Sequence, residues 1–246
     1  MKRTLFLTTV LVACSVFLFA QATTEKKPYQ MYSTTLMKAK QGHEDQFEAA
    51  VKAHNTKYHP TGPHFARLSA ITYGSGSDGW YIWGMGPTTY TQLDGQPQGN
   101  KAHDDDWSNT VDPHVESYGE ANIWRLQEDL SYTPPNYMPD KIDVWSIDLK
   151  MGERYRFAEL MKKWKKLWDE KKYSWSLRVF YNELWNADGP DATIVYSFSK
   201  YADFDDDTKW REDYEAMYGV GSWDQFWKEW RECVVSVDEH IREFVK

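Results

Sequence analysis

The sequence lacks the short motifs by which many catalytic and nucleotide-binding proteins are recognised. It has no Gly-x-Ser-x-Gly elbow, no phosphate-binding loop, no His-Glu-x-x-His pair and no Cys-x-x-Cys pair. Serine hydrolases of the elbow type, P-loop nucleotide hydrolases, zincin proteases and thioredoxin-like oxidoreductases are therefore not indicated. Any functional site must be sought among residues that come together only in the fold.

Cysteine and positive charge are also scarce. The chain has two cysteines, Cys14 and Cys233, and a formal net charge of -8. Cys14 lies in a segment that we expect to be removed, so the mature chain cannot form an intramolecular disulfide. An acidic chain also lacks the basic surface that nucleic acids require. We therefore expect a fold that rests on its core, and no nucleic-acid partner.

The first 22 residues have the organisation of a secretory signal peptide. Lys2 and Arg3 precede an apolar run over residues 5–20, and Ala20 and Ala22 are small residues at the positions that a signal peptidase reads. A membrane helix needs roughly 20 consecutive apolar residues, which neither this run nor any other provides. The sequence predicts cleavage after Ala22, a secreted or periplasmic protein, and no membrane segment after cleavage.

Cys14 leaves a second interpretation open. Residues 11–14, Leu-Val-Ala-Cys, resemble a bacterial lipobox, in which the cysteine would be lipidated and would become the first residue of a membrane-anchored lipoprotein. Cleavage there would leave the apolar residues 16–20 on the mature chain, and only a short apolar core before the cut. Cleavage after Ala22 fits the segment better.

A proline-rich linker, residues 132–139, divides the chain near its middle. Prolines remove backbone donors and interrupt both helices and strands. The linker separates residues 30–131 from residues 140–246, and these two halves resemble each other. Internal similarity of this kind predicts two units of one design within the chain.

The similarity is clearest around two glycines. Gly152 aligns with Gly42 at an offset of 110, and Phe157 then aligns with Phe47. Each glycine follows a strand-like run, and each phenylalanine begins an apolar stripe at helical spacing. Both halves are thus expected to open with a strand, a turn and a helix.

The remaining elements also occur in the same order in both halves. Two strands joined by a turn rich in Gly, Asp and Asn follow the helix, and a polar, partly helical stretch leads to a last strand. This β-α-β-β-α-β order predicts an α+β fold of two tandem ferredoxin-like halves, whose sheets pack together and bury each other's open face. The expected strands are residues 32–39, 65–73, 80–85, 121–129, 142–149, 175–184, 193–198 and 240–245.

The order of elements resembles the dimeric α+β barrel superfamily, and within it the NIPSNAP and antibiotic-biosynthesis-monooxygenase-like groups. The resemblance rests on Lys40-x-Gly42 with Phe47, and on the matching Lys150-x-Gly152 with Phe157 in the second half. It covers nearly the whole mature chain and implies a barrel formed within one chain. None of these residues is catalytic, so the resemblance implies a fold and no particular reaction.

His54 is the most informative single residue. It lies on the apolar stripe of the first expected helix, at the place where the second half has Trp164. Such a histidine can face a cavity as a base or ligand, or it can be a satisfied core residue. With His59 and His64 it would offer three metal ligands, but the prolines between those two indicate an exposed loop, so we expect no metal. Members of the superfamily that bind haem use a histidine ligand, so a haem site would involve the same residues. We expect no cofactor.

Two arginines are the second candidate feature. Arg67 and Arg178 lie at nearly matching places in matching strands, among aromatic and apolar residues. If these arginines face inward, they would suit a carboxylate or another anionic ligand. Alternatively, each arginine pairs with a glutamate inside the protein, or its side chain points outward. Together with His54, Trp83 and Tyr73 they form the candidate ligand-binding set.

The run His-Asp-Asp-Asp at residues 103–106 resembles a cation site at first sight. Calcium loops alternate their ligands along the chain, whereas these carboxylates are adjacent, so we expect a solvated acidic turn. Residues 205–207 form a comparable run, in which Asp206 or Asp207 can cap a helix.

Three functions remain open on this basis. The first is an exported module that binds a small apolar or aromatic molecule between sheet and helices, in keeping with 13 tryptophans and 16 tyrosines. The second is a cofactor-independent oxygenase or isomerase, in which His54 would transfer a proton and a nearby arginine would stabilise charge. The third is a protein-interaction module without a small ligand. The chain can also form a homodimer in each case.

Overall fold

The computed structural model describes residues 29–135, 139–184, 186–187, 189–205 and 208–246. The expected signal peptide with Cys14, and the expected cap at Asp206 or Asp207, lie outside these ranges. Within them, no helix has both the length and the apolar character needed to span a bilayer.

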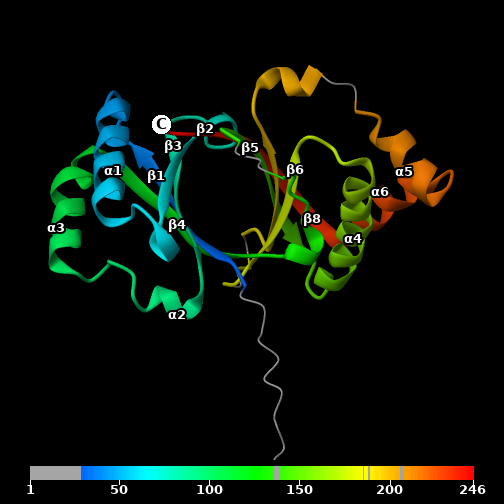
Figure 1. Ribbon diagram of the computed structural model, residues 1–246, viewed down its shortest axis with the longest axis horizontal. Coiled ribbons are helices and arrows are strands. Elements are labelled where there is room, and N and C mark those ends of the chain that lie inside the picture. Colours follow the sequence, from blue (N-terminus) through cyan, green and yellow to red (C-terminus); the bar gives the residue numbers. More distant parts are fainter. Residues whose placement is uncertain (1–28, 136–138, 185, 188, 206–207) are drawn as a thin grey trace, which may run out of the picture.

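Eight antiparallel strands close into a barrel, which Figure 1 shows end-on. Their order around the barrel is β1-β3-β2-β8-β5-β7-β6-β4. The α+β class expected from the sequence is confirmed, with a closed barrel at its centre. The strands are β1 Met31–Ala39, β2 Ala66–Gly74, β3 Trp80–Thr88, β4 Val115–Leu126, β5 Lys141–Leu149, β6 Ser176–Asn182, β7 Ala192–Phe198 and β8 Val234–Phe244.

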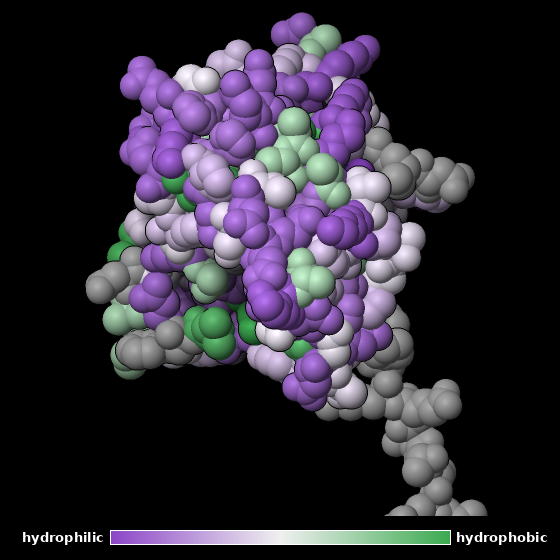
Figure 2. All heavy atoms as spheres, turned by 90° about the vertical axis from the view of Figure 1, so that its left-hand side faces the viewer, coloured by the Kyte–Doolittle hydropathy of each residue, from purple (hydrophilic) through white to green (hydrophobic). Residues whose placement is uncertain are grey.

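The described helices lie outside the barrel in two groups, on opposite sides of it (Figure 1). The first group belongs to the first half of the chain and presents a mostly hydrophilic face to solvent (Figure 2). It consists of α1 Glu44–Tyr58, α2 Tyr90–Leu93 and α3 Lys101–Thr110, and the second group consists of α4 Arg154–Lys171, α5 Trp210–Tyr218 and α6 Ser222–Cys233.

The barrel contains two four-stranded sheets with the same strand order. The first-half strands run β4-β1-β3-β2, and the second-half strands run β8-β5-β7-β6. Two seams join them: β2 pairs with β8, and β4 pairs with β6 through three residue pairs. Because one face of each sheet is covered by helices, joining the sheets at both edges encloses the other face and leaves no open strand edge.

Each sheet has a hydrophobic core on its outer, helix-covered side. Phe47 on α1 and Phe157 on α4 are both fully buried, one in each core. The second core holds most of the aromatic rings, among which Trp168 and Trp210 stack with their centroids 5.6 Å apart. The high aromatic content therefore serves mainly to fill the layer between the second sheet and its helices.

The two aligned glycines have the same role in both halves. Gly42 and Gly152 lie in the turns that lead into α1 and α4, with φ values of +78° and +83°. L-residues with a Cβ rarely adopt this conformation, so glycine is favoured at both turns.

The last strand of each half begins earlier than the sequence suggested. We expected residues 121–129 and 240–245, whereas β4 begins at Val115 and β8 at Val234. In β8, residues 235–239 are exposed and mix valine with serine and acidic residues. The alternation of valine with polar residues covers only residues 235–238, so it is too short to identify a strand on its own.

Asp143 on β5 is a buried carboxyl group, so it makes the stability of the fold depend on pH. Its side chain is 5% exposed, and no hydrogen-bond partner for Oδ1 exists among the described residues. Burial, reinforced by the negative charge of Glu239, raises the pKa of Asp143 to about 7. The protonated form is therefore favoured in the folded state, and stability is lost as pH rises from about 4 to 7.

Asp143→Asn should raise the free energy of unfolding at pH 8 by roughly 1–3 kcal/mol, and at pH 4 by less than about 0.5 kcal/mol. Urea unfolding at the two pH values measures both changes. Asp94→Asn, which alters an exposed carboxylate, is the control and should stay within about 0.5 kcal/mol of the parent chain at both. No gain for Asp143→Asn at pH 8 would show that the folded protein carries the ionised group without penalty.

Candidate functional site

The barrel encloses a cavity of about 790 Å³. Side chains alternate between the two faces of a strand, so every second residue of each strand faces the lumen. All eight strands contribute lining residues, and the volume falls in the range of small-molecule sites, about 300–1,000 Å³. The aromatic residues of the lining are Tyr32, Phe65, Trp80, Trp124, Phe180 and Phe244.

Three arginines from three strands face this lumen. Arg67 comes from β2, Arg178 from β6 and Arg242 from β8. In the described part of the chain, none of the three guanidinium groups forms an ion pair. Arg178 and Arg242 are half-buried and Arg67 is exposed. An anionic ligand would offset the cost of holding the first two without a counter-charge, and Arg67 could reach the same ligand from the cavity wall.

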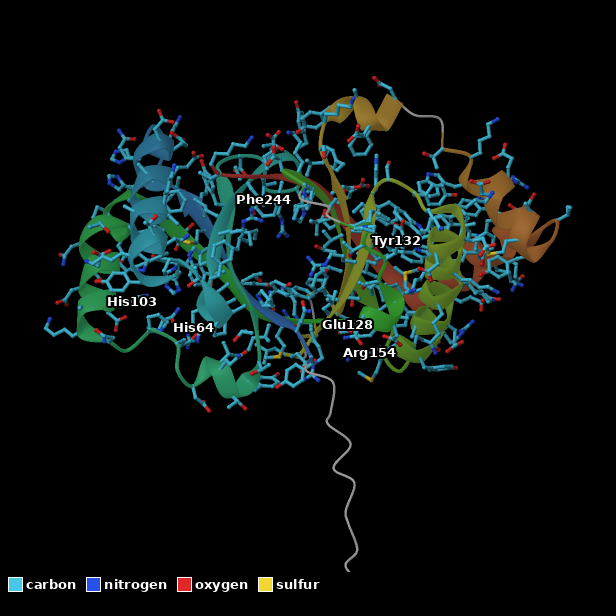
Figure 3. All side chains as sticks on the ribbon, viewed as in Figure 1. His64, His103, Glu128, Tyr132, Arg154 and Phe244 are labelled. Atoms are coloured by element: carbon cyan, nitrogen blue, oxygen red, sulfur yellow. The ribbon has the colours of Figure 1, made fainter. Side chains whose placement is uncertain are left out.

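Neutral groups hold the arginines in place. An Nη2 group of Arg178 donates to the Tyr32 hydroxyl at 3.0 Å, and Nε of Arg242 donates to Nε2 of His240 at 2.7 Å. The guanidinium of Arg67 lies 4.5 Å from the ring centre of Phe244. Figure 3 labels Phe244 at the margin of the central opening. These contacts orient the cations while leaving their charge uncompensated.

Burial also lowers the pKa values of two residues that line the lumen. It lowers the pKa of Arg242 to about 10, and burial together with the neighbouring Arg242 charge lowers the pKa of His240 to about 3. His240 is therefore neutral at physiological pH. Because its Nε2 accepts the Arg242 hydrogen bond, its ring proton resides on Nδ1.

Acidic residues also line the cavity, away from the arginines along β8. Glu120, Asp148 and Asp238 are among the lining residues, and Asp238 accepts a hydrogen bond from Ser75. Asp238 and Arg242 are four residues apart on one strand, about 13 Å along it. On β8 the charge of the lumen therefore changes sign, from an acidic end to a basic end.

The structure separates the five residues predicted as one ligand-binding set. Arg67 and Arg178 line the lumen, whereas Trp83 lies on the other face of the first sheet and His54 lies on α1, which covers that face. Tyr73 is 60% exposed and packs on Tyr201. The larger cavity thus lies inside the barrel, not between sheet and helices, and the proposed partnership of His54 with an arginine is not formed.

His54 belongs instead to a cluster of three buried histidines. His54 and His59, at the end of α1, meet His103 of α3, and each is less than 5% exposed. Nε2 of His103 lies 3.1 Å from Nε2 of His54 and 3.2 Å from Nε2 of His59. Figure 3 labels His103 on the outer side of the first sheet, away from the lumen.

The opposite nitrogen of each ring has its own acceptor. Nδ1 of His54 lies 2.8 Å from a carboxylate oxygen of Asp106, and Nδ1 of His103 lies 2.8 Å from one of Asp104. Nδ1 of His59 lies 2.9 Å from the backbone carbonyl of His64. Carboxylates and carbonyls only accept, so Nδ1 is protonated in all three rings. Burial lowers the pKa of His59 to about 4 and also lowers that of His54, which favours neutral rings.

Two predictions about these residues were wrong. We expected an exposed loop at His59 and His64, whereas His59 is buried and joins the cluster with His103; the ring of His64 lies outside it, against the Gln92 carbonyl. Residues 103–106 do not form a solvated turn: they lie within α3, which Asn100 caps. In a helix, residues three apart share a face. The signal that was missed is the spacing of His103 and Asp106, both of which contact His54.

A second cavity, of about 310 Å³, adjoins the histidine cluster. His59, His103 and Trp83 form part of its wall, together with Trp107 and Tyr118. Trp83 is fixed by a 2.9 Å hydrogen bond from Nε1 to the Asn55 side chain. The first sheet therefore separates two cavities of different chemistry.

No protein-family model and no curated protein sequence matches the chain. Solved structures, in contrast, share its fold. A candidate monooxygenase from Fusobacterium nucleatum superposes with a TM-score of 0.56 at 10% identity, over 90% of this chain and 94% of the other. A candidate monooxygenase from Lactobacillus acidophilus gives 0.55 at 11% identity, over 89% and 95%.

A chlorite dismutase variant from Candidatus Nitrospira defluvii gives a TM-score of 0.51 at 10% identity, over 87% of this chain and 91% of the other. Identities this low demonstrate a common fold and leave the reaction open. The match covers most of both chains, and the eight strands close within a single chain. This protein therefore has the fold of the dimeric α+β barrel superfamily, as the order of its sequence elements indicated.

Proposed function

We propose that the barrel lumen binds a small aromatic or apolar molecule that carries an anionic group such as a carboxylate. The observation that carries this proposal is the set of three arginines, Arg67, Arg178 and Arg242, which face an aromatic-lined cavity without an ion-pair partner among the described residues. A carboxylate can take two parallel hydrogen bonds from one guanidinium, and an aromatic body would pack on the rings of the lining.

An oxygenase on the same scaffold is the second candidate. The monooxygenase names among proteins of the same fold favour it. Catalysis without a cofactor needs a base beside the substrate, and His240 is the imidazole among the described lining residues. Its Nε2 already accepts from Arg242, and its Nδ1 carries the ring proton. Binding without turnover is therefore the function that the lumen supports better.

We also infer that the two halves are tandem ferredoxin-like units, and that the protein acts outside the cytoplasm after loss of residues 1–22. The equal strand order of the two sheets supports the first inference. The basic start, apolar run and Ala-x-Ala site support the second.

Arg67→Met should weaken the binding of aromatic carboxylates at least tenfold, because it removes a charge-assisted hydrogen bond worth about 1.5–3 kcal/mol. Quenching of tryptophan fluorescence by a panel that includes 2-naphthoate measures this, since Trp80 and Trp124 line the lumen. The carboxamide of each ligand should bind the parent chain more weakly and should lose little on mutation.

Arg211→Met is the matched control, because Arg211 lies on the exposed surface of α5 and should leave binding unchanged. Circular dichroism verifies that both variants fold. The proposal fails if carboxylates and carboxamides bind the parent chain equally well, or if neither Arg67→Met nor Arg178→Met alters the affinity.

The export prediction is tested by the mass of the protein isolated from its native cell. Cleavage after Ala22 gives a chain that begins at Thr23, with a mass that matches the unmodified sequence 23–246. A chain that begins at a lipid-modified Cys14 would establish the lipoprotein alternative, and a chain that retains Met1 would contradict both.

A further inference from the structure

We propose that His54, His59 and His103 form a binding site for one divalent transition-metal ion, separate from the barrel lumen. The site lies between the first sheet and the helices α1 and α3, beneath a mostly hydrophilic outer surface (Figures 2 and 3). It does not depend on the lumen ligand, so either proposal can fail alone.

The spacing of the three rings suits a metal ion. One nitrogen from each ring lies within 4.8 Å of the others, and two of the Nε2 separations are 3.1 and 3.2 Å. Tetrahedral sites hold imidazole nitrogens 2.0–2.1 Å from the metal, which places neighbouring nitrogens about 3.3 Å apart. Closing the third separation, which is at most 4.8 Å, to about this value would seat an ion among the three.

The hydrogen bonds of the three rings direct the same nitrogen of each toward the other two. Each Nδ1 lies against an acceptor, so Nε2 is the atom that each histidine presents to the cluster. Nε2 of an imidazole is a common metal-ligating atom. A cation among the three Nε2 atoms would therefore be bound by all of them.

The partners of the rings are those of a prepared metal site. Metal-bound histidines typically donate their other ring nitrogen to a carboxylate or carbonyl, which fixes the ring and makes the ligand more basic. All three rings do so here. Asp106 is itself held by Lys57, whose ammonium lies 2.8 Å from the second carboxylate oxygen. A satisfied core histidine needs one such partner, whereas three rings converging with three such partners indicate a common ligand.

The cluster also leaves room for a further ligand. His59 and His103 line the cavity of about 310 Å³, so an ion held by three protein nitrogens would have a coordination position open toward this space. Three histidines with an open fourth position is an arrangement that supports chemistry, whereas purely structural zinc sites are closed. Imidazole ligands favour zinc, copper, iron and nickel over magnesium or calcium.

Calorimetric titration of the full chain, expressed without an affinity tag and stripped with a chelator, tests the proposal with Zn²⁺ as the probe. We expect one ion per chain, and we expect His103→Gln to weaken binding at least 100-fold, because glutamine keeps the bulk of the side chain but not the imidazole. His54→Gln should behave in the same way. Zn²⁺ should also raise the melting temperature of the parent chain but not of these variants.

Histidines outside the cluster provide the control. His43 and His114 lie with their Nδ1 atoms 3.1 Å apart in an exposed position, and could bind zinc weakly. The double variant His43→Ala/His114→Ala, and separately His64→Ala, should keep the parent affinity, since the His64 carbonyl that contacts His59 remains. Loss of binding in the double variant with retention in His103→Gln would place the ion at the surface pair and overturn the proposal.

A third measurement guards against variants that fail to fold. Asp104→Asn leaves all three ligands in place and should lower the affinity 10- to 100-fold, because the orientation of His103 is less firmly held. Co²⁺ in the parent chain should give the intense visible bands of tetrahedral coordination, and azide should shift them if a position is open. Absence of Zn²⁺ and Co²⁺ binding in the parent chain, or an unaltered affinity in His103→Gln, would overturn the site. Unaltered bands with azide would overturn the open position.

Discussion

Closure of the barrel at the β2–β8 and β4–β6 seams is the constraint on which the rest of this structure depends. Each sheet is covered by helices on one face, and without closure the other face and two strand edges would meet solvent. Closure encloses that second face as a lumen (Figure 1). Alternation along each strand then sends neighbouring residues to opposite sides, so a single strand such as β3 contributes to two distinct environments.

The division is visible at Trp83 and its neighbours. Trp83 faces the helices and contacts His59, with ring centres 5.2 Å apart, while Ile82 and Gly84 face the lumen. The lumen has aromatic lining residues and three guanidinium groups that form no ion pair with the residues the structure describes, which suits an anionic organic ligand. The layer beneath α1 and α3 instead brings together three buried imidazoles, which suits a metal ion. One sheet thus supports two sites with different ligand preferences.

The order and class of the elements were predictable because they depend on local signals. Gly42 and Gly152 mark turns that need positive φ, and Phe47 and Phe157 begin helical stripes that became the two cores. The sites were harder to predict from the sequence, because they depend on which face of a strand each residue occupies. A shift of one residue reverses that face, so sequence alone grouped Arg67 with Trp83, although they lie on opposite sides of the sheet.

Anomalous diffraction from a single crystal grown with Zn²⁺ and 4-bromobenzoate tests the central claim, that the two faces of the first sheet carry separate sites. The account predicts a zinc peak between His54, His59 and His103, and a bromine peak inside the barrel with the carboxylate on Arg67 or Arg178. A zinc peak only at surface residues, together with a bromine peak outside the lumen, would contradict it.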